Sequence, residues 1–186
     1  MEEGVIGLNG TVNCTGIYKE ISPALRCWIY PGQHGPLDVV HGIQNSCNVF
    51  FSEMGHRLSM DENGNYSPEL GIEKIRKYAS LFGLDETSGI EIAEREPQMT
   101  TEKPEASSIG QGKNSYSNVQ LSRYITAVAN KGTVFKLSLL DKMTDSQGNL
   151  LEDFTPEVRS VIDVKDSTWN AVHTGMRRVI SDGSAR

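Results

Sequence analysis

Residues 37–55 read LDVVHGIQNSCNVFFSEMG, and they carry the most informative pattern in the chain. One segment with apolar periodicity leads into the triplet Ser46-Cys47-Asn48, and a second such segment begins at once. The pattern predicts two short helices, the first ending near Asn45 and the second starting near Asn48. The hydroxyl of Ser46 and the carboxamide of Asn48 would then lie side by side, held in place by the two helices. Active sites require polar groups that are positioned in this way.

The triplet by itself is a weak signal, because Ser and Asn are also ordinary residues of helix caps and turns. In that simpler interpretation, Asn48 only caps the second helix. Three further stretches favour the functional interpretation. They are Arg26-Cys27-Trp28 with His34-Gly35 upstream, the segment 108–132 with its runs SIGQG, SNVQL and AVANKG, and the segment 169–186.

In this order, and over residues 12–186, these stretches resemble class B penicillin-binding proteins of the elongation and sporulation type. The triplet Ser46-Cys47-Asn48 matches the second signature of these transpeptidases, which the serine β-lactamases share. The family's other two signatures, Ser-x-x-Lys and Lys-Thr-Gly, do not occur in the sequence. We therefore expect residues 1–186 to be a middle slice of the transpeptidase domain, with Met1 not the native terminus and the nucleophile outside this chain.

The resemblance implies an α/β (α+β) fold of the penicillin-binding transpeptidase and serine β-lactamase type. This slice is expected to be mainly its helical lobe plus a β-hairpin. Residues 4–32 are predicted to form a hairpin or loops, and residues 85–107 to wrap the surface. Apolar periodicity predicts helices near 38–45, 48–57, 68–83, 117–131 and 166–180, and a hairpin over 135–155 with a polar turn at 145–149.

The same periodicity predicts which side chains are buried. The tryptophans Trp28 and Trp169 are both expected in the core. The helix near 117–131 is expected to bury Leu121, Ile125, Val128 and Ala129, and the last helix to share the stripe Trp169, Val172, Met176 and Val179.

Composition indicates one globular piece that does not bind nucleic acid. The chain has 186 residues, of which 37% are hydrophobic and 23% charged, so it can bury one core. Its net charge of −6 argues against a nucleic-acid partner. No stretch of about 18 apolar residues and no signal-peptide pattern is present. The resemblance implies a membrane anchor outside this chain and a location on the extracytoplasmic face of the bacterial membrane.

The three cysteines cannot all pair with one another. Cys14 and Cys27 flank a turn-rich segment and could meet, whereas Cys47 fills the variable position of the triplet. Three free thiols and one disulfide remain open as alternatives. The four histidines show no spacing typical of a metal site or a catalytic triad, so no metal and no cofactor are expected; they are His34, His41, His56 and His173.

The resemblance also implies roles for individual residues. Ser46 would relay a proton between the lysines of the first and third signatures, because a hydroxyl can donate and accept at once. Asn48 would hold a lysine and grip a substrate amide carbonyl. Gly110, Gln111 and Gly112 would form a tight turn beside the catalytic cleft, with Gln111 buried and hydrogen-bonded.

By this resemblance the chain is a fragment of a peptidoglycan D,D-transpeptidase, which cross-links stem peptides through a serine acyl-enzyme and binds β-lactams. The fragment alone is expected to be inactive. Expected partners of the parent are peptidoglycan stem peptides, β-lactams, and cell-wall elongation or sporulation proteins. Two alternatives remain open: a β-lactam-sensing or β-lactam-hydrolysing domain of the same fold, and a non-catalytic scaffold for cell-wall assembly.

Overall fold

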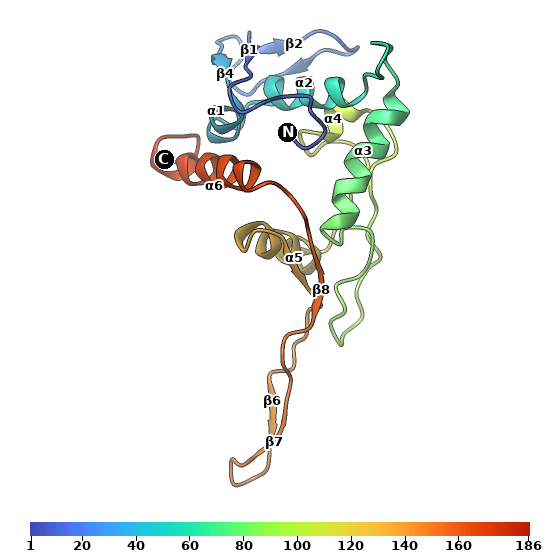
Figure 1. Cartoon of the computed structure of the whole chain (residues 1–186), viewed down its shortest axis with the longest axis vertical. Coiled ribbons are helices and arrows are strands. Elements are labelled where there is room, and N and C mark those ends of the chain that lie inside the picture. The colour runs from blue at the N-terminus through green and yellow to red at the C-terminus, as the bar shows by residue number, and fades with distance from the viewer. The chain divides into compact units, whose positions relative to one another are not determined.

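The computed structural model describes all residues, 1–186, and its elements divide into two units (Figure 1). The first unit comprises residues 1–77, 100–114 and 164–186, and the second comprises residues 78–99 and 115–163. The chain therefore leaves the first unit twice and returns to it twice. None of the helices combines the length and the apolar character that crossing a membrane requires.

The first unit begins with two small antiparallel sheets of two strands each. Their strands are β1 (Val12–Cys14), which pairs with β4 (Gly35–Leu37), and β2 (Ile17–Tyr18), which pairs with β3 (Leu25–Arg26). This agrees with the predicted hairpin or loops over residues 4–32. Two-stranded sheets are marginally stable on their own, so these strands depend on what their side chains contact.

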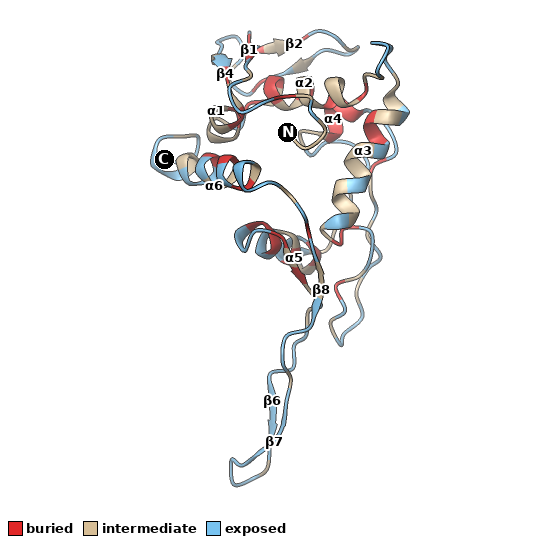
Figure 2. Ribbon diagram, viewed as in Figure 1, coloured by how far each residue is buried: buried red, intermediate tan, exposed pale blue.

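Those side chains contribute to the core of the first unit. Alternate residues of β1 are buried, as expected for a strand with one face on a core. Figure 2 shows buried residues on β1 and on helices α2 (Asn48–Leu58), α4 (Pro104–Ser107) and α6 (Asp166–Ser181). The buried cluster consists of Ile6, Val12, Cys14, Tyr18, Cys27, Leu37, Val39, Cys47, Val49, Phe50 and Ala171.

The helices of the first unit agree with the predicted ones, and one short helix was not predicted. Helix α6 lies along α1 (Figure 1), and α4 packs against α2. The helices are α1 (Val39–Gln44), α2 (Asn48–Leu58), α4 (Pro104–Ser107), α6 (Asp166–Ser181) and α3 (Pro68–Leu81), whose last residues belong to the second unit.

The second unit contains one helix and two strand pairs. Helix α5 (Asn118–Ala129) starts as predicted at Ser117, whose hydroxyl accepts from the N–H of Gln120 while the Gln120 side chain accepts from the N–H of Ser117. The predicted hairpin is confirmed, and Figure 2 shows it exposed along its length. The strand pairs are β5 (Thr133–Phe135) with β8 (Val158–Val161), and β6 (Lys142–Thr144) with β7 (Leu150–Asp153).

The predicted buried face of α5 is largely wrong. Leu121 is 41% exposed and Ile125 is 49% exposed, and Ala129 is also exposed, whereas Val128 is buried as predicted. The buried face instead carries two polar residues, Gln120 and Arg123. Arg123 donates to the carbonyls of Thr87, Gly83 and Glu86, so backbone groups of the loop rather than apolar side chains select this face.

Two other burial predictions need correction. Trp28 is 58% exposed: its ring lies at the surface, where the indole N–H donates to the carbonyl of Asn45 with an N···O distance of 2.8 Å. Trp169 is buried as predicted. Met176 is exposed because α6 turns its small residues toward α1, and a Cβ at Gly175 would lie 2.8 Å from Ile43.

The prediction that residues 85–107 wrap the surface is confirmed for 85–99, where only Ser88 is buried, and is wrong for Thr100 and for helix α4. Thr100 is buried and its hydroxyl lies 2.8 Å from that of Ser107. All four residues of α4 are buried, because a Cβ at Gly55 of α2 would lie only 2.5 Å from the carbonyl of Pro104. Polar contacts and close approach of the backbone hold this segment in place. Such contacts produce no apolar periodicity, so the sequence pattern did not predict the burial.

Candidate active site at the junction of helices α1 and α2

Helix α1 ends in a turn that runs directly into helix α2. The N–H of Ser46 donates to the carbonyl of Ile43 at 2.9 Å, and the N–H of Cys47 donates to the carbonyl of Gly42 at 3.0 Å. This pair of bonds defines a Schellman motif, which satisfies carbonyls left open at a helix end. The two helices pack closely here, since a Cβ at Gly42 would lie 2.6 Å from the ring of Phe50.

Ser46 occupies the left-handed position of this motif, with φ of 48°. Glycine is usual there, because a Cβ in the left-handed region costs roughly 1–2 kcal/mol. The Ser46 hydroxyl is exposed and lies 2.9 Å from the hydroxyl of Ser184. A non-glycine residue held in a strained conformation with its polar group at the surface is typical of functional positions.

Cys47, rather than Asn48, is the N-cap of α2. Its Sγ accepts from the N–H of Phe50 at 3.4 Å, and Asn48 is already the first helical residue. The simpler interpretation of Asn48 as a helix cap is therefore wrong. Its Nδ2 donates to the carbonyl of Arg26 at 3.0 Å, which fixes the carboxamide against the end of β3.

His41 lies on α1 ahead of the triplet and is half-exposed. Its Nδ1 lies 2.8 Å from Oδ1 of Asp38, the N-cap of α1, and its Nε2 lies 3.3 Å from Nη1 of Arg178. Partial burial acts to raise the pKa of Asp38, but hydrogen bonds from the His41 backbone and ring outweigh it, and the net shift is downward. The Asp38 carboxylate therefore stays ionised and anchors the helix start.

The turn Gly110-Gln111-Gly112 follows helix α4. Both glycines have positive φ, 76° and 95°, so the predicted tight turn is present. Gln111, however, is exposed, and the prediction that it is buried is wrong. The turn closes through its backbone, because the N–H of Gln111 donates to the carbonyl of Ala106 at 3.0 Å. No hydrogen bond joins this turn to Ser46 or Asn48, so its role in substrate binding stays a prediction.

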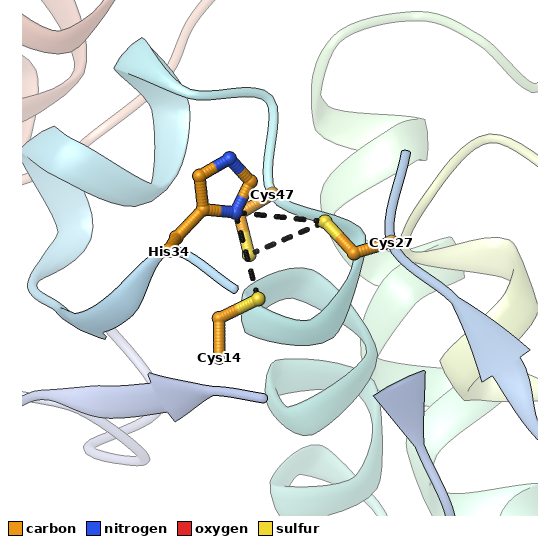
Figure 3. A group of neighbouring side chains, drawn as sticks. All are labelled: Cys14, Cys27, His34 and Cys47. Carbon is orange, nitrogen blue, oxygen red and sulfur yellow. Dashed lines mark hydrogen bonds between the residues drawn. The ribbon is translucent and has the colours of Figure 1, made fainter. Parts of the chain in front are cut away.

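The side chain of Cys47 belongs to a group that the sequence spacing did not indicate. Cys14, Cys27, His34 and Cys47 place their sulfur and nitrogen atoms within 4.8 Å of one another (Figure 3). His34 lies seven positions after Cys27 and Cys47 lies twenty positions after Cys27, and both spacings are longer than the short ligand pairs of recognisable metal motifs. The expectation of no metal site overlooked this group, because only the fold brings these four side chains together.

All three cysteines are buried and unpaired, so the alternative of three free thiols is the one present, and Cys14 and Cys27 form no disulfide. Burial acts to raise the pKa of Cys27, but backbone N–H groups of Ile29, Asn48 and Val49 outweigh it, so the net shift is downward. Burial raises the pKa of Cys47 and lowers that of His34. The four residues are the side chains of this chain best placed to hold a metal ion.

The model of the penicillin binding protein transpeptidase domain matches residues 1–186, the whole chain. The chain belongs to this family. The identification of Ser46-Cys47-Asn48 as the second signature of this domain stays a prediction, and the structure places these three residues at the junction of α1 and α2.

Individual relatives agree with this assignment. The chain is 28% identical over 171 residues to penicillin-binding protein 2A of Bacillus subtilis, a match that covers 81% of this chain and 23% of that protein. It is 24% identical to stage V sporulation protein D of the same organism, covering 87% of this chain and 24% of that one. This transpeptidase chain therefore spans about a quarter of the length of these relatives.

The fold of the transpeptidase chain is also that of a solved relative. Penicillin-binding protein 2B of Streptococcus pneumoniae superposes with a TM-score of 0.78 at 20% identity, covering 97% of this chain and 32% of that one. Its mixed helices and strands are those of the penicillin-binding transpeptidase fold, as the sequence predicted.

Sequence reasoning missed three neighbours of the signature. Ser184 and Arg26 contact Ser46 and Asn48 from segments distant in the chain, and His34 joins the three thiols. The only available signal was that Cys27 and His34 stand in the family's lead-in to the triplet. That signal did not show which atoms the fold brings together.

Proposed function

We propose that the protein carrying this chain is a peptidoglycan D,D-transpeptidase that cross-links stem peptides through a serine acyl-enzyme. Family membership supports the reaction class, and one geometric observation supports the site: Ser46 and Asn48 both present polar groups at one rigid helix junction. The nucleophile and its lysine would come from a Ser-x-x-Lys segment outside this chain. Residues 1–186 alone would then be inactive, as a partial transpeptidase domain.

Ser46 serves in this proposal as a proton relay. The attacking serine must lose a proton and the departing D-alanine amine must gain one. A hydroxyl fits this task because it accepts and donates in the same step. The contact of 2.9 Å between the hydroxyls of Ser46 and Ser184 supports this role, because it places the Ser46 hydroxyl within hydrogen-bond distance of another hydroxyl.

Asn48 serves to hold the substrate and a catalytic lysine. One of its two amide hydrogens is used on the carbonyl of Arg26, which leaves one donor and the Oδ1 acceptor for other groups. Fixing the carboxamide on the first turn of α2 reduces its freedom before substrate arrives, which favours productive orientation.

We further propose that the domain lies on the extracytoplasmic face of a bacterial membrane, held by an anchor outside this chain. Its partners would be peptidoglycan stem peptides, β-lactams as mimics of the acyl-D-Ala-D-Ala end, and cell-wall elongation or sporulation proteins. Gly110, Gln111 and Gly112 would shape the substrate cleft.

Labelling with a fluorescent penicillin tests the function. The natural full-length protein is expected to form a covalent adduct, which intact-mass spectrometry and peptide mapping place on a serine outside residues 1–186. The reaction is expected to be blocked by prior treatment with an unlabelled β-lactam. Rapid turnover of the drug would favour a β-lactam-hydrolysing enzyme instead. A full-length protein that never labels at saturating drug would favour the scaffold alternative, and an adduct within 1–186 would refute the proposed position of the nucleophile.

A further inference from the structure

We propose that Cys14, Cys27, His34 and Cys47 form a structural zinc site that anchors the signature loop from its buried side. Cys14 ends β1, Cys27 follows β3, His34 precedes β4, and Cys47 lies at the start of α2. Four ligands from four separate segments converge in one place (Figure 3). This proposal does not depend on the proposed activity, because its test measures bound metal and not catalysis.

Three of the six distances between donor atoms match the edges of a zinc tetrahedron, and all six are within 4.8 Å. Bond lengths of about 2.3 Å to sulfur and about 2.05 Å to nitrogen give edges of about 3.8 Å between sulfurs and about 3.6 Å between sulfur and nitrogen. The Sγ atoms of Cys27 and Cys47 are 3.9 Å apart. Nδ1 of His34 lies 3.5 Å from the sulfur of Cys14 and 3.6 Å from that of Cys27.

The chemistry of the donor set favours zinc. Three thiols and one imidazole are soft and borderline ligands, which select Zn²⁺ over Mg²⁺ or Ca²⁺. All three cysteines are at most 2% exposed, and Nδ1 of His34 faces two of their sulfurs. Thiols form only weak hydrogen bonds. Without a metal, the contacts among these four groups would therefore offset little of the free energy that burying them costs.

The surroundings also suit the charge of the site. Three thiolates and one Zn²⁺ carry a net charge of −1, and the sulfur of Cys47 sits at the N-terminus of α2, an 11-residue helix. The partial positive charge of a helix N-terminus stabilises such an anion, and the N–H of Phe50 points to this sulfur. Four protein ligands leave no open position, which is typical of structural rather than catalytic zinc.

The site would have a defined mechanical effect. The pairs β1–β4 and β2–β3 are too short to be stable alone, and a metal would tie them to each other and to α2. Cys47 stands between Ser46 and Asn48 in the sequence, so a zinc bound to its sulfur would hold the middle of the triplet while its neighbours face outward.

Metal analysis of the natural full-length protein tests the site. The protein, without a polyhistidine tag and purified under reducing conditions without chelator, is expected to contain close to one zinc ion per chain by plasma mass spectrometry. Exchange with Co²⁺ is expected to give the intense visible bands of tetrahedral cobalt together with thiolate-to-cobalt charge-transfer bands. Protein that contains no zinc and takes up neither metal after reduction would overturn the proposal, as would a disulfide between any two of the cysteines in the native protein.

Variants identify the ligands. Cys27→Ser, Cys47→Ser and His34→Gln are each expected to weaken zinc binding at least 10-fold, whereas His173→Gln, a histidine outside the group, is expected to keep parental zinc. Zinc retained at the parental level in all three ligand variants would overturn the assignment.

A second measurement needs no variant and so does not depend on whether one folds. In the native protein, a chelator is expected to speed alkylation of all three cysteines together. Alkylation at the same rate with and without chelator would contradict the proposal.

Discussion

The α1–α2 junction and the turn of the β6–β7 hairpin are both short polar segments, yet they satisfy their polar groups in opposite ways. In the hairpin turn, Oδ1 of Asp145 accepts from the N–H groups of Gln147 and Asn149, each at 2.8 Å, and the side chain of Asn149 returns to Asp145. At the junction, the partner of Ser46 is 138 residues away and that of Asn48 is 22 residues away.

A second turn in the chain satisfies its polar groups locally in the same way as the hairpin turn. Residues 61–65 read DENGN and residues 145–149 read DSQGN, and both place glycine at positive φ and close through the same aspartate and asparagine contacts. Hydrogen bonds from the asparagine lower the pKa of both Asp61 and Asp145. Such turns use their polar groups internally. The junction instead keeps a hydroxyl and a carboxamide facing outward, which a functional site needs.

The largest expected effect is that of Ser46→Ala in the full-length protein. Loss of the proposed relay is expected to slow penicillin acylation about 10²–10⁴-fold, with the melting temperature nearly unchanged. Stopped-flow acylation and thermal unfolding measure the two quantities. Ser146→Ala, in the hairpin turn, is the matched control and should acylate at the parental rate. If Ser46→Ala also acylates at the parental rate, the serine of the α1–α2 junction has no more functional importance than the serine of the hairpin turn.

Asn48→Ala is expected to act on both acylation and apparent affinity for the drug, because it removes the group that fixes the substrate amide. Since Cys47 caps α2, the loss of stability should be only that of one hydrogen bond, about 1 kcal/mol. The second-order acylation rate and urea unfolding separate the two effects. Asn149→Ala, whose side chain serves only its own turn, should leave acylation intact; a merely less stable Asn48→Ala protein with normal acylation would refute the catalytic role.

Gly42→Ala tests how tightly the junction is packed. A Cβ at Gly42 would lie 2.6 Å from the ring of Phe50, so the substitution is expected to lower the free energy of unfolding by about 1–3 kcal/mol. Gly7→Ala, where no atom lies within 4 Å of the new Cβ, should change stability little. Equal effects in urea titrations of the two variants would show that the close helix contact is unimportant.

Ser46→Gly should separate stability from function. Glycine relieves the left-handed strain at φ of 48°, and after the entropy lost by a glycine the net gain is expected to be about 0.5–1 kcal/mol. Acylation should nevertheless fall as in Ser46→Ala. A protein that loses stability on this change would mean that the Ser46 side chain contributes more to the fold than its strain costs.

Asp38→Asn gives the smallest effect. The pKa of Asp38 is lowered in the folded protein, so its stabilising effect is present above its ordinary pKa of about 3.9 and is lost as the pH falls through the lower folded value. Asparagine still caps α1, so at pH 7 the variant should lose less than about 1 kcal/mol. Urea unfolding at pH 7 and at acid pH is expected to show the difference between the two proteins shrinking in acid; a difference that grows would contradict the assigned shift.

Much of this molecule follows from the sequence, because the features concerned are local. Apolar periodicity predicts α2, α3 and the helix from Ser117 that the structure shows as α5, and the polar run at 145–149 predicts a hairpin turn. Each depends on residues within about one helical turn or one hairpin, where propensity and capping act directly. The order of the family motifs likewise placed Ser46 and Asn48 at one helix junction.

Tertiary structure alone decided the rest, because it depends on which distant segments meet. Leu121 and Ile125 have the spacing of a buried face, yet Gln120 and Arg123 are buried in their place by bonds to loop carbonyls. The three thiols and the imidazole of the proposed zinc site are spread over residues 14–47 with no recognisable spacing, and they meet only because four separate segments converge on the start of α2. Apolar periodicity in the sequence shows which face of a helix or strand is apolar, but only the tertiary packing determines which face is buried and by which segments.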